Sequence, residues 1–348
     1  MDYATITSDY CCGIDLHAKS MYVCLMDRAG QIQYHRNLKN DFALLTQAIE
    51  PYRKSLSIGV ESTYNWYWLA DGCQQAGIPF YLGHALYMKA IHGGKKKNDR
   101  IDSQTLADLM RSNFFPLAYA YPEKMRATRD LLRRRHRFVS LRAESYSHIQ
   151  NTFSQQANFD ICRDDVRKKT TRRVIPQRLD HPDLSLSVDC DLDLIDQLDE
   201  TIRKIENQVL VQAKHHDRTA LSILLTVPGI GRILALTILY EIHTITRFKS
   251  AGHLSSYSRL VKVQRESAGK KIKGSHAKIG NPHLKWAFSE IILIAQRSSA
   301  PIKKHYEKLQ SKHGTGKAKT LIAHQFGIAI YHMLKNGQAF DEKRFVSG

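Results

Sequence analysis

Four acidic residues have the types and the spacing that a divalent-metal site requires. Asp15 and Glu61 each follow a short apolar run, as an acid at the end of a buried strand does. Asp99 and Asp102 stand three residues apart at the start of a helical stretch, so both carboxylates lie on one helix face. Hard cations such as Mg²⁺ or Mn²⁺ take oxygen ligands, and two such ions about 4 Å apart can clamp both oxygens of a phosphodiester exchange. The set therefore indicates metal-assisted phosphodiester chemistry.

Each of these acids also has a structural explanation when it is taken alone. Asp99 is suited to cap the helix, and Asp102 is suited to the positive end of the helix dipole. An acid that ends a buried strand is harder to explain in this way, because an isolated buried charge is costly. The order of strand-end Asp, strand-end Glu and helical Asp pair is what favours a shared metal site.

The elements that position these acids follow from the apolar pattern of the first 111 residues. Strands are expected at 10–15, 21–26, 31–38, 56–60 and 78–82, and helices at 41–52, 66–76 and 99–111. Three meandering strands followed by alternating helices and strands is the order of the ribonuclease-H-like fold, and it differs from a dinucleotide-binding domain. In that fold the first and fourth strands are neighbours and the last helix packs beside them. We therefore expect the four acids to converge.

Two helical segments with a heptad pattern follow this α/β region. Residues 124–153 predict a long helix that is rich in arginine, and 155–189 predict a polar, irregular passage. The second heptad segment has apolar residues at alternating spacings of three and four: Ile195, Leu198, Ile202, Ile205 and Val209. The pattern fits a hairpin within one chain and equally a coiled-coil contact between chains. We expect three parts, an α/β domain at 1–123, a helical or coiled-coil segment at 124–218 and a mainly α domain at 219–348.

Charge is distributed unevenly along the chain. The formal net charge is +19 and the pI is about 9.6, so a polyanion is the expected partner. Residues 247–319 hold 17 lysines and arginines against three acids, and this region is expected to contact phosphate. Residues 180–206 hold nine acids against two basic residues, and this segment is expected to avoid nucleic acid.

Two glycine-containing segments are candidates for contact with a phosphate backbone. VPGIG at 227–231, before an apolar helix expected at 233–242, is similar to a helix-hairpin-helix turn, in which glycines let backbone N–H groups approach phosphate. An ordinary helical corner fits it equally well. GGKKK at 93–97 is a basic loop placed to hold a backbone over the acids, with a solvated loop as the alternative. GTGKA at 314–318 lacks the further residues of a nucleotide-binding loop and predicts a basic turn.

Cysteine usage and hydropathy indicate a cytoplasmic protein. The six cysteines form no Cys-x-x-Cys pair and no zinc-like spacing with histidine, which predicts reduced thiols. No apolar run approaches the roughly 20 residues that a membrane span needs. The first residues lack the basic-then-apolar order of a secretory signal. We expect a cytoplasmic location at the bacterial nucleoid and no membrane partner.

Together these segments resemble the bacterial insertion-sequence transposases that join a DEDD, Holliday-resolvase-like (RuvC-like) N-terminal domain to a C-terminal transposase domain. The site-specific DNA invertase of Piv type belongs to the same group. The resemblance covers nearly the whole chain, and it rests on GIDLH at 13–17, VEST at 60–63, KNDRID at 97–102, VPGIG at 227–231, and LSSYSRL, RESAGK and HAKIGN between 254 and 281. It departs at Ala268, where many relatives have Gly, and at Ser103, where many have Ala.

The resemblance implies an enzyme that cleaves and exchanges DNA strands between an insertion element and its target. It implies that Asp15, Glu61, Asp99 and Asp102 bind Mg²⁺ or Mn²⁺. It also implies a C-terminal serine that attacks DNA, best matched by Ser267, although four other serines lie nearby: Ser255, Ser256, Ser258 and Ser275.

The expected partners are donor DNA, target DNA and further copies of the chain in a dimer or tetramer. The resemblance adds a structured non-coding guide RNA (a bridge RNA) made by the element itself. Contacts with nucleic acid are expected from basic residues around the acids, on the arginine-rich helix and around Ser267: Lys95, Lys96, Lys97, Arg133, Arg134, Arg135, Arg137, Arg265, Lys270, Lys271, Lys273 and Lys278.

Three other interpretations compete with this one. A metal-dependent Holliday-junction resolvase or nuclease would use the same carboxylates without a serine–DNA intermediate, but it leaves residues 254–285 unexplained. A sugar-kinase or actin-like ATPase shares the first-strand Asp, but it needs a Gly and Ser/Thr turn where this chain has LHAK at 16–19. A non-catalytic nucleic-acid-binding protein would have no reason to gather four acids within a basic chain.

Overall fold

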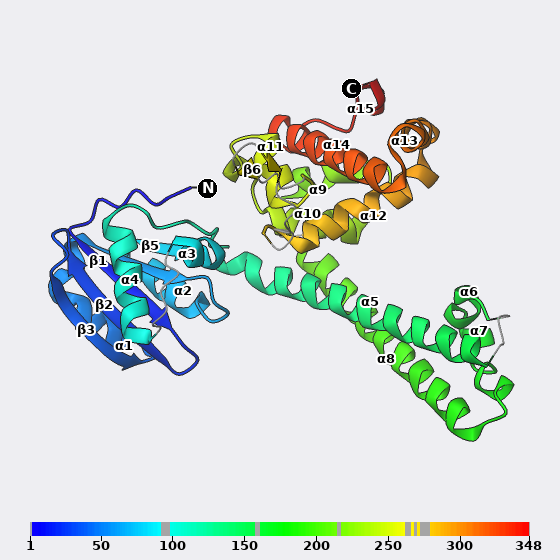
Figure 1. Cartoon of the computed structure of the whole chain (residues 1–348), viewed down its shortest axis with the longest axis horizontal. Helices are drawn as coiled ribbons and strands as arrows, with labels where there is room; N and C mark the ends of the chain where they lie inside the picture. The colour runs from blue at the N-terminus through cyan, green and yellow to red at the C-terminus, as the bar shows by residue number, and fades with distance from the viewer. Residues whose placement is uncertain are drawn as a thin grey trace. The chain divides into compact units, whose positions relative to one another are not determined.

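A computed structural model of the chain describes residues 2–91, 98–156, 161–213, 217–261, 266–267, 270–271 and 279–347, with the backbone alone at 89–91, 163, 266–267 and 270–271 (Figure 1). The chain divides into two compact units, Met1–Lys124 and Met125–Gly348. Within the described ranges, none of the helices combines the length and the apolar character that a membrane crossing needs. The six cysteines carry free thiols, as predicted.

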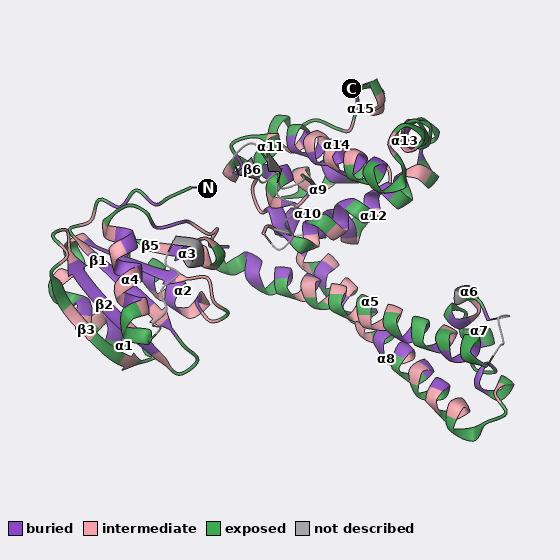
Figure 2. Cartoon of the chain, viewed as in Figure 1, coloured by how far each residue is buried: buried purple, intermediate pink, exposed green. Residues whose placement is uncertain are grey.

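The first unit is built on a five-stranded mixed sheet in the order β3-β2-β1-β4-β5. The strands β1 (Tyr10–Leu16), β2 (Ser20–Asp27) and β3 (Ile32–Lys39) form an antiparallel meander. On the other side of β1, β4 (Leu56–Glu61) and β5 (Phe80–Gly83) run parallel to it. This confirms the predicted mixed α/β sheet, and the strand order is consistent with a ribonuclease-H-like domain. Buried residues fill the central strands, whereas the edge strand β3 is exposed or half-buried (Figure 2).

Helices cover both faces of this sheet. On one face α1 (Phe42–Ile49) and α2 (Tyr67–Gln75) bury Leu45 and Leu69 against Ile14 and its neighbours. On the other face α4 (Asp99–Arg111) packs against β1 and β2. The bounds of α4 are those predicted, but the helix expected at 41–52 ends its α part at Ile49 and continues as a 3-10 helix over Glu50–Ser55. The short helix α3 (Ala85–Ile91) was not predicted.

Two long helices form an antiparallel hairpin in the second unit. These are α5 (Glu123–Gln155) and α8 (Pro182–Gln212). Ion pairs join them in reverse order along the chain, at Arg135–Glu206 (2.7 Å), Arg142–Asp199 (2.5 Å) and His148–Asp191 (2.5 Å). The acid-rich stretch that was expected to avoid nucleic acid therefore pairs with the arginine-rich helix.

The heptad seam of α8 is buried within the single chain. All five of its residues are at most 8% exposed: Ile195, Leu198, Ile202, Ile205 and Val209. Ile195 packs in one apolar cluster with Tyr146 and Ile149 of α5, and Val209 packs in another with Leu132. Of the two interpretations of this pattern, the structure shows the hairpin within one chain. The seam is not available as a contact between chains.

The passage 155–189, predicted to be irregular, is largely helical in the part that the structure describes. It contains α6 (Arg163–Arg167), α7 (Lys169–Arg172), a 3-10 turn over Pro176–Arg178 and the first turns of α8. Arg172 is almost fully buried and pairs with Asp196 of α8. The prediction was wrong because these polar residues are satisfied by partners across the hairpin, which local pattern cannot reveal.

Helices make up most of the remainder of the second unit: α9 (Arg218–Leu225), α10 (Arg232–Ile242), α11 (Ala251–Tyr257), α12 (Pro282–Ser298), α13 (Ala300–His313), α14 (Thr315–Asn336) and α15 (Glu342–Ser347). α10 is the central element, because every residue from Leu234 to Ile242 is buried. Between α11 and α12 the described backbone includes two short antiparallel strands, β6 (Glu266–Ser267) and β7 (Lys270–Lys271). The expected basic turn at 314–318 is a single glycine, Gly314, between α13 and α14.

A buried carboxylate on α10 connects three helices. Arg129 and Arg133 of α5 donate to Glu241 at 3.0 and 2.6 Å, and Asn281, which caps α12, donates to it at 2.7 Å. Burial alone would raise the pKa of Glu241, but hydrogen bonding to Arg133 and the charges of both arginines outweigh burial and lower the pKa to about 2. The ionised carboxylate therefore stabilises the attachment of α5 to α10 and α12.

We predict that Glu241 makes the stability of the protein sensitive to acid. Because its folded pKa of about 2 lies below the ordinary value of 4.5, its contribution is complete above pH 4.5 and is lost as the pH falls toward 2. Its size is about 3 kcal/mol. Glu241→Gln should cost about 3–5 kcal/mol at neutral pH, since it leaves both arginine partners without their counter-charge, and should flatten the pH dependence below 4.5.

Urea unfolding of the variant and the wild type between pH 2.5 and 7 measures both effects. Glu144→Gln, an exposed glutamate of α5, is the control and should change stability by less than about 0.5 kcal/mol. A Glu241→Gln protein as stable as the wild type at neutral pH would contradict the prediction.

Candidate functional site

The position of α4 over the sheet depends on a glycine in β1. A Cβ atom at Gly13 would lie 2.3 Å from the backbone nitrogen of Ala107 and 2.4 Å from the backbone oxygen of Ser103. Backbone atoms cannot yield as a flexible side chain can, so only glycine permits this approach. Ser103, the departure from Ala noted above, is fully buried in this contact. The close packing brings the first turn of α4 to the end of β1.

Strand alternation and register place Asp15 and Glu61 on the α4 side of the sheet. Side chains two apart on a strand share a face, so Asp15 faces the same side as Gly13, and Glu61 the same side as Gly59. Gly59 also lies beneath α4, since a Cβ there would meet the sulfur of Met110 at 2.5 Å. The parallel register pairs Ile14 with Val60. Asp15 and Glu61 are the next residues along these two strands, so they lie side by side.

The helical pair of acids begins α4. The cap of this helix is Asn98, whose Oδ1 accepts a hydrogen bond from the backbone N–H of Ile101 at 2.8 Å. The alternative role of Asp99 as the cap is therefore wrong. Asp99 and Asp102 both lie in the first turn, and the side chain of Asp99 is half exposed. The Asp99 carboxylate is therefore not engaged in capping the helix.

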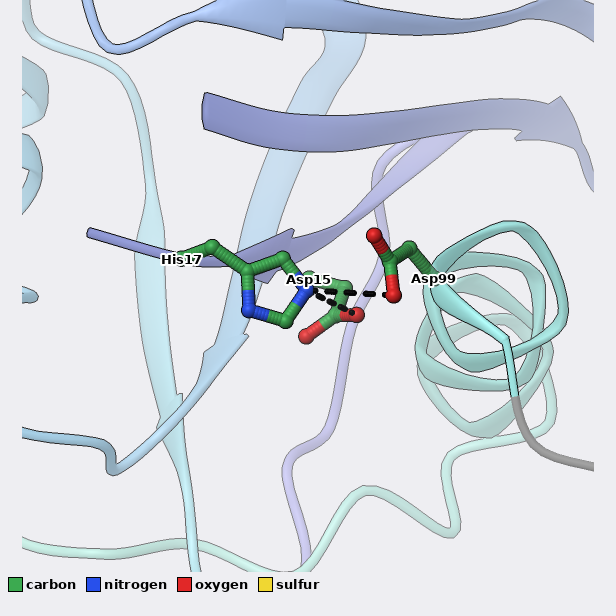
Figure 3. Close-up of side chains that lie close together, drawn as sticks. All are labelled: Asp15, His17 and Asp99. Carbon is green, nitrogen blue, oxygen red and sulfur yellow. Dashed lines mark ion pairs between the residues drawn. The ribbon is translucent and has the colours of Figure 1, made fainter. Parts of the chain in front are cut away.

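His17 joins the acids from the end of β1 (Figure 3). Its Nε2 atom lies 3.2 Å from Oδ2 of Asp15 and 3.2 Å from Oδ1 of Asp99. Donor atoms of these three residues all lie within 4.8 Å of one another, a spacing that a metal ion can bridge. His17 was not among the residues predicted for the site. The signal was present, because a residue two positions after Asp15 on a strand shares its face.

The pKa of Asp15 is affected by the charges of the other three acids. Burial raises the pKa of this carboxyl group, His17 lowers it, and the negative charges of Asp102, Asp99 and Glu61 raise it further. The close group of potential ligands contains Asp15, His17 and Asp99, and the convergence of Glu61 and Asp102 on it remains a prediction. A set of carboxylate oxygens with mutual repulsion is chemically suited to hold a divalent cation.

The arginines predicted to contact nucleic acid fall into two groups. Arg133 is held by Glu241, and Arg135 by Glu206, so both stabilise helix packing. Arg134 and Arg137 are exposed on α5. Among the other basic candidates, Lys270 and Lys271 are placed by backbone only, and six lie outside the described residues: Lys95, Lys96, Lys97, Arg265, Lys273 and Lys278.

The glycines of the predicted helix-hairpin-helix turn have different surroundings. Gly229 has a φ of +91°, and a Cβ there would lie 2.7 Å from the backbone nitrogen of Ala295 on α12. This glycine is thus required for a close contact between the turn and α12. Gly231 is the N-cap residue of α10, and a Cβ there would have no described atom within 4 Å. Of the two, Gly231 alone retains the open surroundings that a phosphate contact needs.

The burial of the nearby serines limits which of them could attack DNA. Ser267 ends β6, and the register places it opposite Lys270 of β7. Ser255 and Ser258 are fully buried in the helical core, so neither hydroxyl can reach a DNA backbone, whereas Ser256 is exposed. Ser275 lies outside the described residues.

Two segments of the chain match profiles of known transposases. Residues 12–156 match a DEDD profile described as a transposase, and residues 221–307 match the profile described as transposase IS116/IS110/IS902 family. The first matched segment spans most of the α/β unit with its clustered acids and is similar to DEDD transposases, and the second lies in the helical unit and is similar to transposases of the IS116/IS110/IS902 family.

One curated relative is similar to part of the chain. The chain is 28% identical over 148 residues to the insertion element IS110 uncharacterized 43.6 kDa protein of Streptomyces coelicolor. The match covers 42% of this chain and 36% of the relative, so the chain matches about a third of the length of that protein.

Proposed function

We propose that the protein is a metal-dependent DNA transposase that cleaves and exchanges strands between an insertion element and its target. The observation that carries this proposal is the meeting of Asp15 and Asp99, from a strand end and a helix start, in a chain that matches two transposase profiles. Asp15, Glu61, Asp99 and Asp102 would hold the cation. The bound cation supplies charge neutralisation for the attacked phosphodiester and activation of the attacking group.

We propose Ser267 as the group that attacks DNA. A serine hydroxyl is a weak nucleophile at neutral pH, so it needs a base, a metal or a strong positive field. The sequence surrounds it with lysines and an arginine, and the register of β6 and β7 places Lys270 opposite it. Attack forms a bond from the serine oxygen to phosphorus and breaks one bond from phosphorus to a deoxyribose oxygen. The new phosphodiester conserves the energy needed to rejoin the strands.

We further propose a guide RNA and an assembly of at least two chains. The exposed Arg134 and Arg137 on a 33-residue helix offer a basic surface that suits an RNA backbone. Exchange of two duplexes requires several coordinated cuts, which is the reason to expect more than one chain. Because the heptad seam is buried within one chain, it is not the surface through which copies would meet.

The metal site is tested by Asp15→Asn, with Asp9→Asn as the control at an exposed acid of the same unit. Removing the Asp15 charge leaves an incomplete ligand shell, so cleavage and strand exchange should fall by at least about 10³-fold, close to the background. Since burial and like charges disfavour the ionised Asp15, the variant should be at least as stable as the wild type in chelator. Full strand exchange by this variant, or by the wild type with the metal chelated, would contradict the proposal.

The nucleophile is tested by trapping a covalent protein–DNA adduct. Ser267→Ala should lose the adduct and strand exchange while folding and RNA binding are retained. Ser256→Ala and Ser275→Ala are the controls and should form the adduct. Peptide mapping that finds DNA on another residue would exclude Ser267, and cleavage with no adduct at all would favour a resolvase-type nuclease.

The RNA surface is tested by comparing two pairs of arginines on the same helix. Arg134→Gln with Arg137→Gln should weaken binding of the element's own RNA and reduce the slope of log affinity against log salt by about 1 for each phosphate that the variant no longer neutralises. Arg133→Gln with Arg135→Gln should lower the stability instead, because both side chains pair with acids in the fold. Strand exchange that survives ribonuclease treatment would rule out guidance by RNA.

A further inference from the structure

We propose that His17 is a nitrogen ligand of the cation held by Asp15 and Asp99, and that it makes this site selective for Mn²⁺ over Mg²⁺. The inference rests on the proposed metal site and adds a side chain to it that the four-acid pattern does not contain. It concerns which ion the protein prefers as well as which residues hold it.

The spacing of the donor atoms fits a shared ion. Adjacent ligands of an octahedral cation lie about 3 Å apart when each is about 2.1–2.2 Å from the ion. The Nε2 atom of His17 lies 3.2 Å from a carboxylate oxygen of Asp15 and 3.2 Å from one of Asp99. Figure 3 shows the imidazole edge directed at both carboxylates from the strand end.

The backbone at His17 is held firmly from three sides. Its N–H donates to the carbonyl of Ser20 at 2.9 Å, and its own carbonyl accepts from the side-chain amides of Asn40 at 2.8 Å and Asn65 at 2.5 Å. Asn65 lies in the segment that leaves β4 just after Glu61, so the chain that carries one acid also fixes the position of the imidazole. The imidazole therefore projects from a fixed point beside the acids.

The chemistry of the donor set predicts the preference between ions. Mg²⁺ takes oxygen ligands almost without exception and keeps a strict octahedral shell, whereas Mn²⁺ accepts imidazole nitrogen more readily and tolerates varied geometry. Four carboxylates alone would serve either ion. An imidazole among the ligands should therefore raise the affinity of the site for Mn²⁺ more than its affinity for Mg²⁺.

The test is direct binding of Mn²⁺ and Mg²⁺ to the full-length protein without DNA. Pulsed electron paramagnetic resonance on bound Mn²⁺ should show coupling to the nitrogen-14 of an imidazole in the wild type and not in His17→Ala. Calorimetry should show Mn²⁺ affinity falling by about tenfold or more in that variant, with Mg²⁺ affinity changing by less than about threefold. His17→Asp, which replaces nitrogen by oxygen, should restore binding and shift the preference toward Mg²⁺. His332→Ala, at an exposed histidine on α14 of the second unit, is the control and should keep the nitrogen signal.

The outcomes separate this inference from the proposed function. If Asp15→Asn weakens Mn²⁺ binding but His17→Ala keeps both the nitrogen signal and the Mn²⁺ preference, the metal site stands and the role of His17 is refuted. If the wild type binds neither ion, or binds both unchanged after Asp15→Asn, the metal site itself is refuted and the inference falls with it.

Discussion

The contact between β1 and α4 at Gly13 is the constraint on which the acidic site depends. Because helix backbone lies directly over the glycine, any side chain there would push α4 away from the sheet. The first turn of α4 would then no longer reach the end of β1, where Asp15 and His17 lie. Asp15, His17 and Asp99 therefore meet only because α4 packs close to the sheet. This close packing requires that residue 13 has no Cβ atom.

In the second unit, acidic residues balance the charge of the arginine-rich helix α5. A chain with a net charge of +19 must prevent its own arginines from repelling one another where helices pack. Acids of α8 and the buried Glu241 neutralise one side of α5, and the exposed side keeps its positive charge. One helix thus contributes both to the stability of the fold and to a basic surface.

The sequence predicted most of the first unit because its elements are encoded locally. Apolar runs marked the five strands, and the acids at their ends marked the site. His17 was not predicted because the metal site was inferred from carboxylates alone, although His17 stands two residues after Asp15. The roles of Arg133 and Arg135 could not be predicted, since their partners lie 108 and 71 residues away in the sequence. The passage 155–189 was predicted to be irregular because its pattern does not show that buried Arg172 pairs with Asp196 of α8.

The shared carboxylate of Glu241 also constrains how this protein can diverge. In the group formed by Glu241, Arg129, Arg133 and Asn281, loss of Glu241 would leave both arginines without their shared counter-charge, and loss of either arginine would leave the buried carboxylate with one charged partner fewer, so each of these substitutions should cost stability. Replacement of the whole group by apolar residues of similar volume would avoid that penalty, yet it requires several changes at once. We therefore expect these four positions to be kept together or replaced together as the sequence diverges.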